Sequence, residues 1–119
     1  MLEQKKVSDF KFGVFEALDT MQKMVTGYDS PYRDDVFRYE TDDLTVDTCI
    51  AHDTRCWETG IVDRRYSDDW IIVTEYNNRE EAKKGHDDWV AVLTGNDLPK
   101  EIVDVHIDET YKLRQGKND

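Results

Sequence analysis

The sequence predicts an α+β domain in which an antiparallel β-sheet of three to five strands is covered by amphipathic helices. Segments 44–51, 56–62 and 70–76 are rich in β-branched and aromatic residues and are separated by polar turns, as strands of one sheet are. Over 79–94 the apolar spacing changes to that of a helix packed by one face. The 119 residues are enough for a single domain (1–119) with one modest core.

The first 43 residues are predicted to form a helical N-terminal extension and a linker. An apolar seam predicts a helix over about 8–26, with steps of four, three, four and three residues through Val14, Leu18, Met21, Val25 and Tyr28. A short strand at 10–12 is the alternative for its first turn. The helix either packs on the sheet of its own domain, which we expect, or docks on a partner chain.

Residues 28–43 are predicted to connect this helix to the sheet. Pro31 lacks a backbone donor and restricts Ser30 to extended conformations, which indicates a turn. The following stretch is too charged for a central strand, although 36–39 fits a short edge strand.

The first two central strands are predicted to present alternate residues to one side of the sheet. One face of the first strand carries Val46, Thr48 and Ile50, and one face of the second carries Trp57, Thr59 and Ile61. The connection at 63–69 is polar and long for a hairpin, so we expect it to be exposed and mobile.

The helix at 79–94 is predicted to begin after an N-cap at Asn78 and to end at Gly95. Gly85 is expected to let this helix approach the sheet closely, and Trp89 to fill the space beyond it. The predicted structural core comprises Trp57, Trp70, Ile72, Gly85, His86, Trp89 and Leu93.

The C-terminal part is predicted to add one edge strand. After a turn at 96–99, residues 101–108 alternate between apolar and polar, with Val103, Val105 and Ile107 on one side. The core is thus expected to run β-β-β-α-β over 44–110. The tail at 114–119 has nothing to bury and is expected to fray.

Charge and composition limit the classes of partner. The net charge is −11, and residues 28–69 carry twelve acidic against five basic residues. Such an acidic middle repels nucleic acid and anionic membranes, and it serves either solubility or binding to a basic partner. No run approaches the ~18 apolar residues of a membrane span, no signal peptide is expected, and two cysteines suggest a reducing setting.

Two interpretations account for Cys49, His52, Cys56 and His86. Their spacing offers sulfur and nitrogen donors, of which a zinc site needs four in a tetrahedron. Alternatively, His86 is a core histidine bonded to a backbone carbonyl, and the two thiols act as small apolar side chains. We expect the second arrangement and predict no metal site.

No catalytic constellation is recognisable. Adjacent acids on a strand or helix point in different directions, so the pairs at 34–35, 42–43, 68–69, 80–81 and 87–88 do not form a dyad by adjacency. No glycine-rich phosphate loop, nucleophile elbow or calcium loop occurs. We therefore predict a protein that is not an enzyme and has no cofactor.

Three motifs resemble a family of small uncharacterised proteins encoded by tailed bacteriophages and prophages of Gram-positive bacteria. They are Trp57-Glu58-Thr59-Gly60-Ile61, then Trp70-Ile71-Ile72-Val73 with Glu75-Tyr76, and then Glu80-Glu81-Ala82 with Gly85-His86 and Trp89-Val90. The segment Thr45-Val46-Asp47-Thr48-Cys49 before them belongs to the same pattern. The resemblance covers roughly residues 44–94. It implies a phage protein in the host cytoplasm or the virion, and it brings no reaction, cofactor or catalytic residue.

Two functional hypotheses follow. The first is a non-enzymatic phage protein that acts through protein–protein contacts, as a virion-associated or assembly component, with self-association as a further hypothesis. The second is an acidic inhibitor that occupies a basic, nucleic-acid-binding surface of a host or anti-phage defence protein. The partner-binding residues predicted for the second are Asp34, Asp35, Asp42, Asp43, Asp63, Asp68 and Asp69.

Overall fold

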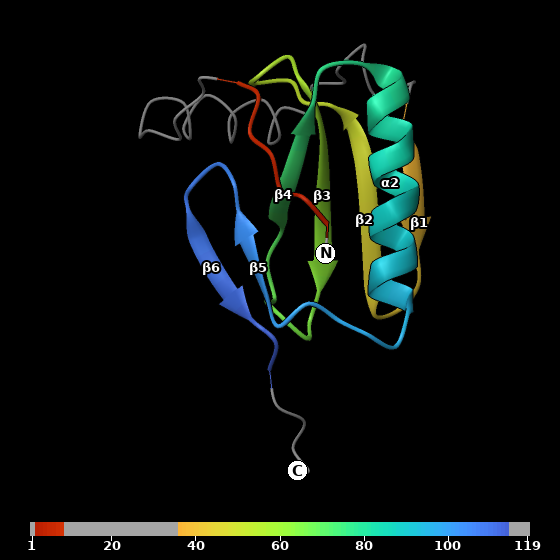
Figure 1. Ribbon diagram of the computed structural model, residues 1–119, viewed down its shortest axis with the longest axis vertical. Coiled ribbons are helices and arrows are strands. Elements are labelled where there is room, and N and C mark those ends of the chain that lie inside the picture. Colours follow the sequence, from red (N-terminus) through yellow and green to blue (C-terminus); the bar gives the residue numbers. More distant parts are fainter. Residues whose placement is uncertain (1, 9–35, 115–119) are drawn as a thin grey trace, which may run out of the picture.

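The computed structural model describes residues 2–8 and 36–114, and the predicted N-terminal helix and C-terminal tail lie almost wholly outside them. The described part is an α+β fold, as predicted: a four-stranded antiparallel sheet of order β1-β2-β3-β4, one helix, and a two-stranded hairpin (Figure 1). The elements are β1 (Phe37–Glu40), β2 (Leu44–Ile50), β3 (Trp57–Asp63), β4 (Ile71–Tyr76), α2 (Arg79–Thr94), β5 (Glu101–Asp104) and β6 (Glu109–Lys112). None of the helical segments described is both long and apolar enough to cross a membrane.

The helix α2 lies across one face of the four-stranded sheet, and the main core lies between them (Figure 1). Trp89 is only 2% exposed and is surrounded by strand side chains and Leu93. The strand residues of this core are Leu44, Val46, Ile61, Ile71 and Val73. The predicted core positions Trp57, His86, Trp89 and Leu93 are all buried.

Two predicted core residues lie outside the core: the Trp70 side chain is 50% exposed, and Ile72 is only half-buried. Side chains alternate between the two faces of a strand. Trp70 and the half-buried Ile72 therefore lie on the face that α2 does not cover, while Ile71 and Val73 enter the core. A β-bulge between Thr59 and Gly60 shifts the register of β3 against β4 at this level.

The ends of α2 are formed largely as predicted. The Asn78 side chain accepts a hydrogen bond from the Glu81 N–H at 2.9 Å, and the Glu81 carboxylate accepts from the Asn77 N–H at 3.3 Å. Gly95 ends the helix with φ −89°, so it does not use the left-handed conformation available to glycine. A Cβ at Gly85 would lie 2.2 Å from the Tyr76 ring, which confirms the close approach of helix and sheet.

The connection between β3 and β4 is exposed at residues 64–65 and 68–69, as predicted, but it is anchored by buried residues. Asp63 is 1% exposed, and Tyr66 and Ser67 are also buried. The Tyr66 hydroxyl donates a hydrogen bond to the Pro99 carbonyl at 2.7 Å. This bond ties the connection to the segment that follows α2.

Residues 101–112 form a hairpin instead of the single edge strand predicted for 101–108. The reason is local: the Asp104 carboxylate accepts hydrogen bonds from the backbone N–H groups of His106 and Ile107 at 2.8 and 3.2 Å. This side chain competes with strand pairing and turns the chain at 105–108. Asp108, in the left-handed region at φ 57°, completes the turn.

Candidate functional site

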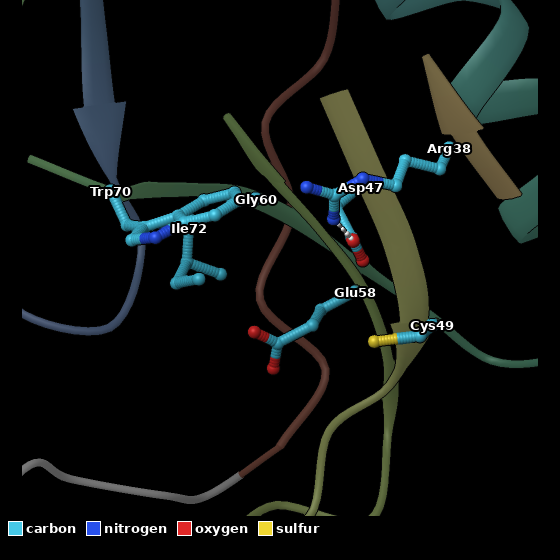
Figure 2. A pocket seen from close by; sticks show the side chains of 7 residues that line it. All are labelled: Arg38, Asp47, Cys49, Glu58, Gly60, Trp70 and Ile72. Carbon is cyan, nitrogen blue, oxygen red and sulfur yellow. Dashed lines mark hydrogen bonds and ion pairs between the residues drawn. The ribbon is translucent and has the colours of Figure 1, made fainter. Parts of the chain in front are cut away.

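The sheet face opposite α2 carries a hollow of about 190 Å³ (Figure 2). Arg38 forms an ion pair with Asp47 at its β1–β2 side. At its β4 side the Trp70 ring lies over Gly60, where a Cβ would be only 3.3 Å away. The full lining comprises Arg38, Asp47, Cys49, Glu58, Gly60, Trp70 and Ile72. The hollow is thus apolar at one end and charged at the other.

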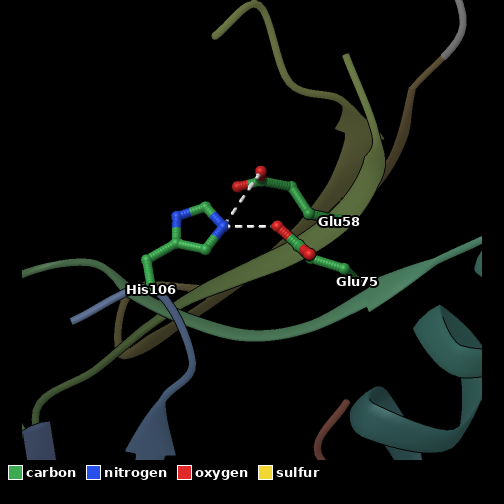
Figure 3. A group of neighbouring side chains, drawn as sticks. All are labelled: Glu58, Glu75 and His106. Carbon is green, nitrogen blue, oxygen red and sulfur yellow. Dashed lines mark hydrogen bonds and ion pairs between the residues drawn. The ribbon is translucent and has the colours of Figure 1, made fainter. Parts of the chain in front are cut away.

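Next to the hollow, three ionisable side chains from three elements converge (Figure 3). Glu58 comes from β3, Glu75 from the adjacent position of β4, and His106 from the turn of the β5–β6 hairpin. The His106 Nε2 lies 2.6 Å from Glu75 Oε2 and 3.8 Å from Glu58 Oε1. The side chains are 10%, 0% and 7% exposed for Glu58, Glu75 and His106, so all three groups are shielded from water.

Glu75 is held by four donors. Its Oε1 accepts hydrogen bonds from the backbone N–H groups of Val7 and Ser8, both at 2.7 Å. Its Oε2 accepts from the Ser8 hydroxyl at 2.9 Å and contacts His106. Burial raises the pKa of Glu75, but these hydrogen bonds outweigh it and hold the pKa below its usual value. Glu75 is therefore a carboxylate at neutral pH.

Glu58 has the opposite electrostatic environment. Burial raises its pKa well above the ordinary value, and the nearby charges of Asp53, Glu75 and Asp104 raise it further. Its Oε1 has no hydrogen-bond partner within the described part of the chain. The pKa values of two neighbouring carboxyl groups are thus shifted in opposite directions, which is an arrangement that can share a proton or hold a cation.

The N-terminal residues 2–8 border this site along β4. Lys5 accepts a backbone hydrogen bond from Glu75 at 2.7 Å. The Gln4 side chain donates to the carbonyl oxygens of Val73 and Val103 and accepts from the Val103 N–H. Gln4 therefore joins β4 to β5 where these strands do not pair directly, and it completes the edge on which Glu75 lies.

The four residues considered as zinc ligands do not come together. His86 lies on the α2 side of the sheet, where its Nδ1 is 2.9 Å from the hydroxyl of Thr48. The Thr48 hydroxyl is also hydrogen-bonded to the Thr59 hydroxyl, which in turn bonds to the Tyr76 hydroxyl. His86 therefore bonds to a network of side chains and not to the backbone carbonyl that we expected. Cys49 lines the hollow on the other face, and neither Cys49 nor Cys56 forms a disulfide. Burial lowers the pKa of His86.

The predicted acidic surface is only partly assembled. The turn after β1 and the connection after β3 lie at the same end of the antiparallel sheet, and there Asp42, Asp43, Asp68 and Asp69 are exposed. Asp63 is buried in an ion pair with Arg65 at 2.7 Å, so it is not a surface residue. Arg114 also pairs with Asp68 at 3.2 Å, which offsets part of the negative charge. Asp34 and Asp35 lie outside the described residues.

The sequence reasoning missed the cluster of Glu58, Glu75 and His106. The available signal was two glutamates inside strands that otherwise read as buried, since a carboxylate in such a place needs partners. His106 carried no signal, because it alternates with Val105 and Ile107 as a polar residue of the predicted edge strand.

No protein-family model, curated protein or solved structure matches this chain.

Proposed function

We propose that this chain is a non-enzymatic, phage-encoded protein that binds another protein through the open face of its sheet, as a virion-associated or assembly component. The observation that carries the binding role is Trp70, a tryptophan left half exposed at the rim of a hollow. Tryptophan and arginine are the residues most often found at the energetic centres of protein interfaces. The phage assignment comes from the three sequence motifs described above.

The surroundings of Trp70 suit a partner side chain. The ring is supported by Gly60 and Ile72, so it is held in place before binding and loses little conformational freedom. The Arg38–Asp47 ion pair borders the same hollow and supplies polar groups to orient a ligand. A small apolar or amide-bearing partner side chain fits this combination.

Mass spectrometry of virions purified from a host carrying the gene tests this proposal. We expect the protein at stoichiometric copy number, lost from particles in Trp70→Ala and retained in Ile107→Ala. Ile107 is the matched control, because it is the other large apolar side chain exposed in the described chain, at 48%. Absence of the wild-type protein from particles contradicts the virion role, and equal retention of both variants contradicts the role of Trp70.

A second candidate is the acidic inhibitor of a basic, nucleic-acid-binding surface. It is favoured by the placement of Asp42, Asp43 and Asp69 at one end of the sheet, and opposed by the arginine pairs there. Binding of this kind is steered by charge and weakens as salt rises from about 50 to 200 mM. A pull-down from host lysate decides it: reversing these three aspartates to Lys should abolish salt-sensitive capture, whereas Glu109→Lys on β6 should not. Capture that is unaffected by salt or by the triple reversal contradicts this candidate.

A further inference from the structure

We propose that Glu58, Glu75 and His106 bind one divalent first-row transition-metal ion, which fastens the β5–β6 hairpin to the four-stranded sheet. The three ligand atoms lie within 4.8 Å of one another and come from β3, β4 and the hairpin turn (Figure 3). Glu58 also lines the hollow beside Trp70, whereas Glu75 and His106 are not part of that lining.

The spacing of the atoms suits an ion at their centre. Ligands bound at about 2.0–2.2 Å in a tetrahedron lie about 3.3–3.6 Å from each other. The separation of His106 Nε2 from Glu58 Oε1 is 3.8 Å, close to this range, and no two of the three ligand atoms are more than 4.8 Å apart. The 2.6 Å contact between His106 and Glu75 has to open by about 1 Å for both atoms to bind one ion.

An unpartnered oxygen points into the site. Glu58 is 8% exposed, and its Oε1 faces the His106 ring without a hydrogen-bond partner among the described residues. A buried polar atom without a partner is uncommon in native proteins and calls for a missing donor, water or ion. A cation bound between the three ligand atoms would supply the partner that this oxygen lacks.

Hydrogen bonds from neighbouring groups also fix the ligand residues in place. Glu75 is fixed by the N–H groups of Val7 and Ser8 and by the Ser8 hydroxyl, and the His106 backbone is fixed by the Asp104 carboxylate at 2.8 Å. Such supporting hydrogen bonds orient ligands in metal sites and strengthen binding. Two carboxylates with one imidazole favour Zn²⁺ or Mn²⁺ over Ca²⁺, which prefers oxygen ligands alone. Three protein ligands leave at least one position for water.

Titration calorimetry on the full chain, freed of metal with a chelator and then dialysed, tests the proposal. We expect one Zn²⁺ per chain with micromolar or tighter affinity, weaker Mn²⁺ binding and no Ca²⁺ binding, in the order of ligand preference. Glu58→Gln, which keeps the shape of the side chain, should weaken Zn²⁺ binding at least about 100-fold. Glu109→Gln, an exposed carboxylate on the same hairpin, should bind like the wild type.

Metal-induced thermal stabilisation provides a second readout, since only ions bound to the folded state raise the melting temperature. Zn²⁺ should raise the melting temperature of the wild type and of Glu109→Gln, and leave that of Glu58→Gln and His106→Gln unchanged. Should one variant fail to fold, the other carries the comparison. Absence of saturable binding, or equal affinity of wild type and Glu58→Gln, overturns the proposal.

Discussion

Trp89 and Trp70 show how the position of a single residue decides its role. Both are large: Trp89 lies on α2, and Trp70 immediately precedes β4 of the sheet on which α2 packs. Trp89 is 2% exposed in the core under α2, whereas Trp70 is 50% exposed on the opposite face. Substitutions at these two positions should therefore affect stability and binding separately.

Replacing Trp89 by Ala is expected to cost about 3–5 kcal/mol of unfolding free energy, because a buried tryptophan leaves a cavity. Trp70→Ala should cost much less, about 1 kcal/mol, since half of its surface is already in water. Urea denaturation monitored by circular dichroism measures both. A cost below about 1 kcal/mol for Trp89→Ala would mean that this helix face is not the core.

Glu75 is expected to make the protein less stable at acidic pH than at neutral pH. Its pKa is lowered in the folded state, so its contribution is complete above the unfolded-state value of about 4.3 and is lost as the pH falls through the folded value. Glu75→Gln should cost about 2 kcal/mol or more at pH 7, because hydrogen bonds from Val7 and Ser8 to a charge are lost.

The difference in unfolding free energy between wild type and Glu75→Gln should shrink as the pH falls below about 4. The reason is that the wild-type carboxyl then also becomes neutral. Chemical denaturation across pH 3–7 measures it, with the exposed Glu109→Gln as control. A difference that stays constant over this range would contradict an ionised, hydrogen-bonded Glu75.

At the scale of elements, two close fits hold the fold together. The helix α2 approaches β4 at Gly85, where no Cβ intervenes before the Tyr76 ring. On the other side of β4, the Gln4 side chain substitutes for strand pairing with β5. Each fit centres on one residue, Gly85 or Gln4, so each can be tested by one substitution.

Gly85→Ala should destabilise the protein, although alanine favours helices by about 1 kcal/mol. The added methyl would meet the Tyr76 ring and hydroxyl at 2.2 Å, and Tyr76 is held by its hydrogen bond to Thr59 at 2.9 Å. We expect a net loss of at least about 1 kcal/mol from overpacking. Lys84→Ala, an exposed neighbour, should change stability by less than about 0.5 kcal/mol. A stabilised Gly85→Ala variant would show that helix and sheet can separate freely.

Gln4→Ala should loosen the hairpin from the sheet. It leaves the Val73 carbonyl and the Val103 N–H without their partner at 3.0 Å, at a cost of about 1–3 kcal/mol for buried groups. Hydrogen exchange of the Val103 amide should accelerate, while Glu3→Ala, with an exposed side chain, should leave it unchanged. Unchanged protection of Val103 in Gln4→Ala would contradict the bridging role.

For the whole molecule, the net charge of −11 destabilises the folded state, because like charges repel one another. The described ion pairs at Asp47, Asp63 and Asp68 offset part of it. The remaining negative charges repel one another. The distance over which this repulsion acts falls from about 30 Å at 0.01 M salt to about 10 Å at 0.1 M.

Added NaCl is therefore expected to raise the melting temperature at pH 7 over this range, by a few degrees. Differential scanning calorimetry measures the effect. Near the isoelectric point of about 4.6 the same salt series should give little change, because the net charge is then small. A melting temperature that falls with salt at pH 7 would mean that attractive pairs outweigh the repulsion.

The central strands and α2, with Asn78 as its N-cap, were determined by the sequence alone. The physical reason is that side-chain periodicity and capping act within about four residues, so they can be recognised from the sequence. Periodicity predicted a single strand at 101–108, but the Asp104 side chain turns this alternating segment, and residues 101–112 form a hairpin.

Only the tertiary structure decided which face Trp70 occupies and which polar groups meet. Periodicity places Trp70 and Ile71 on opposite faces but does not say which face α2 will cover. The cluster at Glu75 joins residues 31 positions apart, and the Gln4 bridge joins residues 99 positions apart. Such contacts arise when separate elements pack, and burial then imposes on Glu58 and Glu75 the different pKa values that no local pattern encodes.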